Sequence, residues 1–147
     1  MIFPFITAAV FATDYFVKKK VNTELKSGDE KEILGGHVVL NKCTNKGFAC
    51  NFLEENPDLV KKITMFICAM IGCLWVKELF CRKHPVRKLG LSFLLGGGLM
   101  NLYDRHQNGE VTDYFSFKGK DGKKGKLAYN LSDMFIFLGS ILTAVDN

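Results

Sequence analysis

Four aspartates stand at the edges of apolar segments, where a charged side chain is costly: Asp14, Asp104, Asp113 and Asp133. An ionisable residue within or beside a membrane segment is a candidate for function. Asp14 and Asp104 end apolar segments, Asp133 opens one, and Asp113 follows the third segment closely enough to fold back to its end. If the segments alternate in direction, all four carboxylates gather on one side, near one surface.

Two carboxylates in a poorly hydrated site can share one proton, because neighbouring like charges cannot both ionise freely. Such a pair can hydrolyse a peptide bond without a metal or a Ser or Cys nucleophile. One carboxylate takes a proton from water while the other polarises the carbonyl. Asp113 lies in the apolar stretch VTDYF and Asp133 in YNLSDMF, so these two are the stronger candidates. Their spacing alone does not establish a catalytic pair.

Each aspartate also has a simpler interpretation. Asp14 could flank or cap a helix end, and Asp104 with its neighbour Arg105 could form an interfacial ion pair that holds a loop. Asp133 could be a helix N-cap. Asp113 could be merely solvated, although its apolar neighbours fit that interpretation poorly.

The elements that must position these side chains are four blocks of sequence that are nearly free of charge. They comprise residues 1–13, 63–76, 89–103 and 134–145, whereas charge is dense in 14–62 and 104–126. The second, third and fourth blocks are apolar on all sides, which is atypical of helices in a soluble bundle. A cleavable signal peptide is an alternative for the first block, but no basic residue precedes its apolar core.

We therefore expect a mainly α membrane protein with a single integral-membrane domain over residues 1–147. The four transmembrane helices are expected at about 1–17, 62–81, 87–104 and 128–146. The regions 18–61 and 105–127 are expected to be extracellular. The first of them contains the strand-like Val38–Leu40 and a turn or short helix around Pro57, which predicts a small β-layer and a short helix.

Four spans place both termini on one side of the membrane. The basic link between the second and third blocks favours a cytoplasmic location for that link. The lysines at 18–20 and in the run 119–126 would then lie outside, so the charge count leaves the orientation open.

Composition excludes several other classes. The net charge is +5, and the basic residues are spread over loops without interleaved aromatic residues, which argues against nucleic-acid binding. That balance suits contact with anionic membrane lipids. The three histidines and five cysteines lack metal-ligand spacing, so we expect no metal and no cofactor. Cys43 and Cys50 could form a disulfide if their loop faces an oxidising space.

Five short motifs follow one another along the chain in a recognisable order. They are Asp14–Lys18 (D-x-x-x-K), Asn45–Gly47 (N-x-G), Gly96–Gly97 with Asn101–Arg105 (GG, then N-x-x-D-R), Gly109–Tyr114 (G-x-V-x-D-[FY]) and Tyr129–Asp133 ([FY]-N-x-[AS]-D). Each motif is short, but jointly they are specific. The chain resembles the lipoprotein signal peptidase, or signal peptidase II, family.

The resemblance implies an aspartic endopeptidase whose catalytic pair is Asp113 and Asp133. Residues that would support the substrate and the pair are Asp14, Lys18, Asn45, Gly47, Asn101, Asp104, Arg105 and Asn130. The implied substrate is a prolipoprotein cleaved just before its diacylglyceryl cysteine. The implied location is the bacterial inner membrane, as a multi-pass protein with cytoplasmic termini and an active site at the outer leaflet. We expect a monomer.

The sequence also departs from the family pattern. In the family, small residues and then Phe usually follow the motif glycine, whereas Phe48, Ala49 and Cys50 follow Gly47 here. Met100 stands where a glycine is usual before the asparagine. The lysine-rich loop 118–126 adds charge between the catalytic motifs. These departures suggest a divergent paralogue with altered substrate fit. They leave open a non-catalytic family member that binds acylated peptides, and a small proton-conducting protein, which would need charges spread through the membrane depth.

Overall fold

The computed structural model describes residues 2–26, 28–48, 51–119, 124–125 and 127–146. Along the chain, the helices and strands follow in the order α1, β1, β2, α2, α3, β3 and α4. The helices are α1 (Phe3–Glu24), α2 (Pro57–Leu79), α3 (Pro85–Asn108) and α4 (Leu131–Val145). The strands are β1 (Glu30–Ile33), β2 (Val38–Asn45) and β3 (Val111–Phe117). This confirms a mainly helical chain with a small antiparallel sheet.

Local sequence explains where the helices begin and end. A proline stands in the first turn of α1, α2 and α3, where its fixed φ fits the helix and no N–H is needed. The expected short helix around Pro57 is instead the first turn of α2. Between β1 and β2 lies a single 3₁₀ turn, η1 (Leu34–Gly36). Helix α3 ends at Asn108 and is followed by the C-cap residue Gly109, whose φ of 76° favours glycine.

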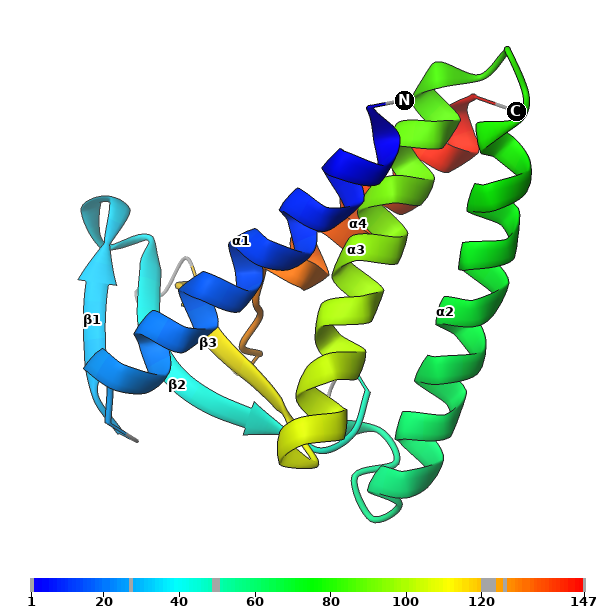
Figure 1. Ribbon diagram of the computed structural model, residues 1–147. Coiled ribbons are helices and arrows are strands. Elements are labelled where there is room, and N and C mark those ends of the chain that lie inside the picture. Colours follow the sequence, from blue (N-terminus) through cyan, green and yellow to red (C-terminus); the bar gives the residue numbers. More distant parts are fainter. Residues whose placement is uncertain (1, 27, 49–50, 120–123, 126, 147) are drawn as a thin grey trace.

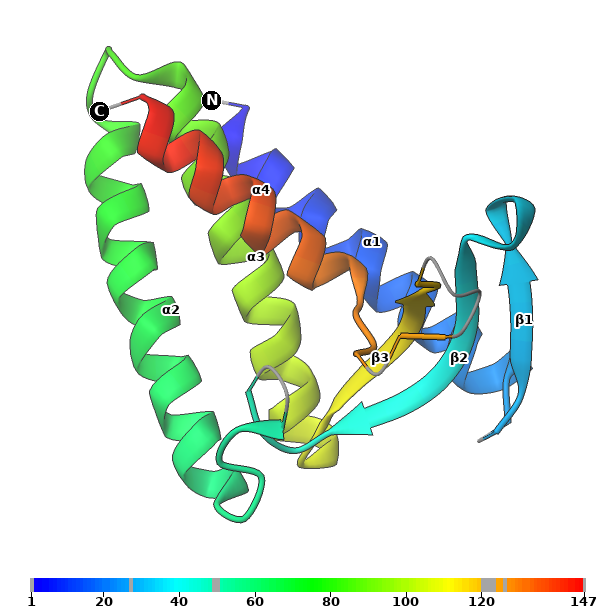
Figure 2. The ribbon, with the colours of Figure 1, turned by 180° about the vertical axis from the view of Figure 1, so that it is seen from behind.

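Helix α3 is the centre of the helical layer and packs against α1, α2 and α4 (Figures 1 and 2). Glycines allow two of these close approaches. A Cβ on Gly96 would lie 2.7 Å from the Thr7 oxygen of α1, and one on Gly97 would lie 2.7 Å from the Ser132 oxygen of α4. Helix backbones can approach this closely only where the side chain is minimal.

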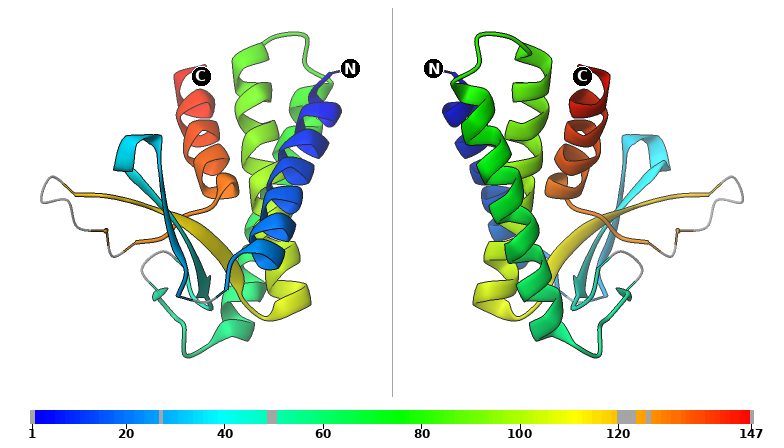
Figure 3. Two further views of the ribbon diagram at one scale, coloured as in Figure 1. Left: turned by 90° about the vertical axis from the view of Figure 1, so that its left-hand side faces the viewer. Right: turned by 90° about the vertical axis from the view of Figure 1, so that its right-hand side faces the viewer.

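The sheet has the order β1-β2-β3, with both pairs antiparallel. In the β2–β3 register, Cys43 lies opposite Asp113, next to an irregularity between Leu40 and Cys43. The expected strand at 38–40 is confirmed and runs on to Asn45. The sheet projects sideways from the end of the helical layer that lies away from the two chain termini (Figures 1 and 3).

By length and composition, α2 is the helix in the described part of the chain that could cross a membrane. Helix α4 is apolar but has only 15 residues. The predicted number of four spans is therefore not established by hydropathy. The physical reason is visible in α1 and α3, which bury charged side chains within the molecule, including Lys18, Lys88 and Arg105. Such residues lower the hydropathy of a helix even when lipid never contacts them.

Candidate active site

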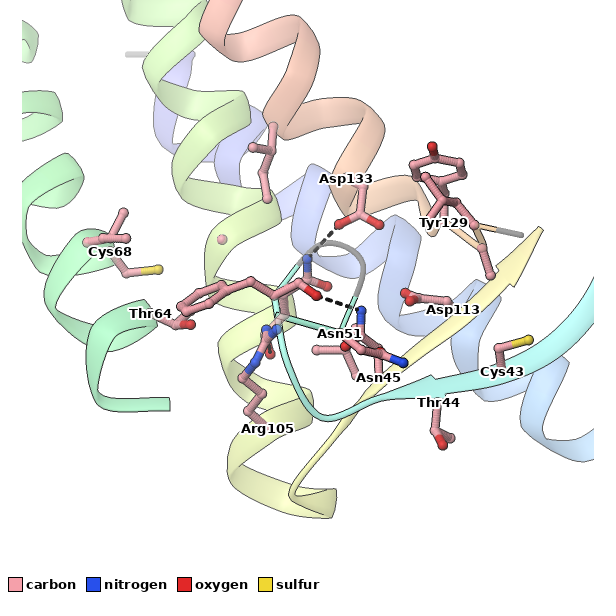
Figure 4. A pocket seen from close by; sticks show the side chains of 18 of the residues that line it. Cys43, Thr44, Asn45, Asn51, Thr64, Cys68, Arg105, Asp113, Tyr129 and Asp133 are labelled. Carbon is pink, nitrogen blue, oxygen red and sulfur yellow. Dashed lines mark hydrogen bonds between the residues drawn. The ribbon is translucent and has the colours of Figure 1, made fainter. Parts of the chain in front are cut away.

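A cavity of about 1070 Å³ lies between α2, α3, α4 and the sheet. Its walls are largely apolar and include Ile67, Ile71, Leu94 and Ile136. Polar residues lie together at the sheet: Asp113, Asp133, Asn45, Asn101 and Arg105. Figure 4 shows the side chains of Asp113 and Asp133 near one another at this cavity. The structure thus combines an apolar space with two carboxylates from different elements.

Asp133 is positioned by the start of α4. Asn130 is the N-cap of this helix, and Asp133 is the third helical residue rather than the N-cap itself. The two form a capping box: Asn130 Oδ1 accepts from the Asp133 N–H at 2.9 Å, and Asp133 Oδ2 accepts from the Asn130 N–H at 3.1 Å. The other carboxylate oxygen, Oδ1, accepts from Asn101 Nδ2 of α3 at 3.0 Å.

Asp113 is positioned by β3, where alternate side chains face the helices and the sheet surface. It is buried, and its Oδ1 accepts from Asn130 Nδ2 at 2.6 Å. Burial and then the nearby charge of Asp133 raise the pKa of Asp113 to about 7, while the hydrogen bond from Asn130 opposes that shift. Asp113 therefore keeps its proton up to about pH 7.

Lys18 is the most deeply buried cation of the site, with 2% of its surface exposed. Its Nζ lies 3.1 Å from Asp14, 2.8 Å from Asp104 and 3.0 Å from Asn101 Oδ1. A buried ammonium is tolerated when opposite charges and hydrogen bonds surround it in this way. Because Asn101 also contacts Asp133, Lys18 is one hydrogen-bonded residue away from the candidate catalytic pair.

Asp14 joins α1 to β3 and α4 rather than simply ending a helix. It is completely buried, and its oxygens accept from the Tyr114 hydroxyl at 2.8 Å and from the Ser132 hydroxyl. The Tyr114 oxygen in turn accepts from the Leu131 N–H at 2.9 Å, which satisfies a free donor at the start of α4. Burial, followed by the charge of Asp14, raises the pKa of Tyr114, so its hydroxyl remains a donor.

The predicted ion pair between Asp104 and Arg105 is wrong. Successive helical residues point about 100° apart and do not face each other. Asp104 pairs with Lys18 and accepts from the Thr112 N–H at 3.2 Å, which fixes the start of β3. Arg105 turns the other way and donates to the carbonyl oxygens of Gly47 at 2.7 Å and Asn101 at 3.4 Å.

Asn45 and Gly47 form a turn after β2 that closes one side of the cavity. Asn45 Oδ1 accepts from the Gly47 N–H at 2.9 Å, and its Nδ2 donates to the Phe48 oxygen at 3.2 Å. A Cβ on Gly47 would lie 2.5 Å from the Phe52 oxygen, so only glycine fits. The Phe48 ring lies 5.8 Å from the Arg105 guanidinium, whose Nε has no hydrogen-bond partner among the described residues.

All ten residues named from the sequence therefore lie in one connected region around the cavity. Sequence reasoning missed two members of it, Tyr114 and Ser132. Both stand beside a predicted catalytic aspartate, in the motifs VTDYF and YNLSD, and that position was the available signal. Among the described residues, no group of His, Cys, Asp and Glu could hold a metal ion. Cys43 has a free thiol, and Cys50 lies outside the described residues.

The fold is shared with bacterial membrane enzymes. Two solved structures of bacterial membrane enzymes match with TM-scores of 0.81 and 0.78, each at 23% identity, over 97% of this chain and 85% and 90% of their own. The family model for signal peptidase II matches residues 6–147. The chain belongs to this family.

Curated relatives agree along most of the chain. The lipoprotein signal peptidase of Sulfurihydrogenibium sp. strain YO3AOP1 is 31% identical, over 76% of this chain and 69% of its own length. Those of Solibacter usitatus and Listeria welshimeri are 25% and 26% identical, over 96% and 99% of this chain and 87% and 92% of their own.

Proposed function

We propose that this protein is a membrane aspartic endopeptidase that removes signal peptides from prolipoproteins by cleaving before the lipid-modified cysteine. One observation carries the proposal: Asp113 and Asp133 open onto the same cavity, and Asn130 makes hydrogen bonds with both residues. In a cavity with apolar walls these two carboxylates cannot both ionise freely, so the pair retains a proton at neutral pH.

A shared proton supports metal-free hydrolysis. One carboxylate takes a proton from water, and the water oxygen attacks the carbonyl carbon while the other carboxyl donates its proton to the carbonyl oxygen. In the reverse transfers, the tetrahedral intermediate returns a hydroxyl proton to the second carboxylate, and the first gives its proton to the leaving nitrogen. The C–N bond breaks, and the two carboxyl groups regain their starting states.

The shape of the cavity suits a substrate that carries both a peptide and acyl chains. Its apolar wall on α2, α3 and α4 can receive acyl chains, and its polar end can receive the peptide. The Nε–H of Arg105, which has no hydrogen-bond partner in the part of the chain that the structure describes, can donate to a substrate carbonyl there. We further propose four membrane spans, cytoplasmic termini, an active site at the outer leaflet and a monomeric enzyme. Both termini lie at the same end of the helical layer, which is consistent with an even number of spans (Figure 1).

Cleavage of a purified, diacylglyceryl-modified prolipoprotein by the purified protein tests the proposal. We expect cleavage by the unmutated protein and by an Asp29→Asn control, whose carboxylate is exposed, and none by Asp113→Asn or Asp133→Asn. Equal cleavage by the two site variants would exclude this catalytic pair. Binding of the lipidated substrate without any cleavage would instead identify a non-catalytic family member.

A further inference from the structure

The two candidate catalytic aspartates are held by two asparagines whose amide orientations are fixed. An asparagine side chain has a donor NH₂ and an acceptor oxygen, so the partner of one end determines where the other end points. Asn101 Oδ1 lies 3.0 Å from Lys18 Nζ, and an ammonium group can only donate. The NH₂ of Asn101 must therefore point to Asp133, 3.0 Å away.

Asn130 is fixed in the same manner, but by the backbone. Its Oδ1 accepts from the Asp133 N–H, which has no acceptor capacity, at 2.9 Å. Its NH₂ is thereby directed to Asp113 Oδ1 at 2.6 Å. The orientation of Asn101 thus depends on a side chain, whereas that of Asn130 depends only on the helix start.

Lys18 cannot readily leave this position. Its ammonium is held between Asp14 and Asp104 at 3.1 Å and 2.8 Å, and these two carboxylates are themselves buried. A lysine whose head group were solvated would rotate among several positions. Here the ammonium and the Asn101 oxygen form one fixed donor–acceptor contact. Lys18 thereby determines that the NH₂ end of the Asn101 amide faces Asp133.

The surroundings of the two aspartates are unequal as a result. Both oxygens of Asp133 accept N–H groups, and the residue lies in the first turn of α4, where the helix dipole favours a negative charge. Asp113 lies in the middle of β3, where it contacts the N-cap side chain of α4 rather than belonging to that helix, and its burial favours the neutral form. The charged and titratable groups that surround the pair within the described residues come from every neighbouring element: Lys18 and Asp14 of α1, Cys68 of α2, Asp104 and Arg105 of α3, Cys43 of β2, Tyr114 of β3 and Tyr129 before α4.

We propose that Lys18 is a positioning residue that gives the two aspartates different roles: acting through Asn101, it holds Asp133 as the charged base, so Asp113 supplies the proton. The inference rests on the proposed function and deepens it. Asp133 accepts the proton of the attacking water, and the proton of Asp113 moves to the carbonyl oxygen. When the C–N bond breaks, Asp133 releases its proton to the leaving nitrogen and Asp113 recovers one from the intermediate.

Infrared difference spectroscopy tests this assignment without any turnover. At about pH 6 the unmutated protein should show the carbonyl band of a buried protonated carboxyl group. We expect the band to disappear in Asp113→Asn and to remain in Asp133→Asn. The opposite pattern, or no such band in the unmutated protein, would overturn the assignment of roles.

The role of Lys18 is tested by the pH profile of kcat/KM in Lys18→Met, with Lys19→Met as the matched control because Lys19 is exposed and adjacent. Loss of the ammonium should move the acidic limb of the profile upward by about one pH unit, which is about a tenfold loss of activity below that limb. Lys19→Met should keep the profile of the unmutated protein. A Lys18→Met profile that is lower but unchanged in shape would show a merely structural role.

Two precautions keep the test decisive. If Lys18→Met does not fold, as judged by thermal unfolding, Lys18→Met with Asp104→Asn removes both members of one buried ion pair and leaves fewer unpaired charges. The acidic limb of the double variant should lie about one pH unit above that of Asp104→Asn alone. Acidic limbs at the same pH in these two variants would overturn the inference. Absence of cleavage by the unmutated protein at every pH would refute the proposed function. The infrared spectra would still test which aspartate is protonated, because they require no cleavage.

Discussion

Replacing Asp113 with asparagine should make the protein more stable, and the gain should grow with pH. The folded state raises the pKa of this carboxyl from 3.8 to about 7, chiefly through burial. The folded state therefore binds the proton more tightly than the unfolded state, so its stability is greatest below pH 3.8 and falls as pH rises towards 7. An asparagine does not ionise, and its oxygen can still accept from Asn130.

The size of the effect follows from the shift. A difference of about three pKa units corresponds to about 4 kcal/mol of folding free energy at pH 8, at about 1.4 kcal/mol per unit. At pH 5 the carboxyl is mostly ionised in the unfolded state but still protonated in the folded state. The cost to the folding free energy at this pH is therefore only about 2 kcal/mol. The advantage of Asp113→Asn should therefore differ by about 2–3 kcal/mol between these two pH values.

Thermal unfolding in detergent, followed by the fluorescence of the single tryptophan Trp75, provides the measurement. The matched control is Asp58→Asn, which neutralises an exposed carboxylate in the first turn of α2. Its effect should be small and the same at pH 5 and pH 8. A lower unfolding temperature of Asp113→Asn at pH 8, or an equal rise at both pH values, would refute the raised pKa of Asp113.

Two further predictions concern packing and the buried hydrogen bonds. Gly97→Ala should destabilise the protein by about 1–3 kcal/mol and reduce cleavage, because its new Cβ would lie 2.7 Å from the Ser132 oxygen and displace the start of α4. Gly72→Ala is the control, since the nearest atom would be 3.8 Å away, and it should stabilise α2 by about 0.5–1 kcal/mol; equal unfolding temperatures for the two variants would contradict the packing argument. Tyr114→Phe should cost about 1–3 kcal/mol in chemical denaturation, because it leaves the buried Asp14 oxygen and the Leu131 N–H without their partner. A loss no larger than that of Tyr103→Phe, whose ring is partly exposed, would show that this hydroxyl has no such role.

Much of the site could be predicted because it depends on the direction of the chain. Alternating apolar segments place Asp14, Asp104 and Asp133 at one end of the helical layer, and the structure brings them together there. The run of glycines at 96–98 is a further signal in the sequence, because a Cβ at Gly96 or Gly97 would meet a neighbouring helix.

Other features depend on contacts between distant residues, which composition and periodicity do not reveal. The stretch 111–117 becomes a strand because it pairs with β2, more than sixty residues earlier in the chain. Lys18 lies in a basic run that suggests an exposed loop. It is buried because α1 and α3 supply two carboxylates and an amide oxygen at one point.

The sheet is built from two distant segments of the chain, so the residues of the site are synthesised at different times. A ribosome makes α1 and β2 first, then α2 and α3, and only afterwards β3 with Asp113. Asp133 and Asn130, the residue that contacts both candidate carboxylates, come last. The proposed pair of Asp113 and Asp133 is therefore completed only when α4 packs against α3. On the proposed function, the chain would acquire its peptidase site only after α4 has been made, because that helix carries Asp133 and begins at Asn130.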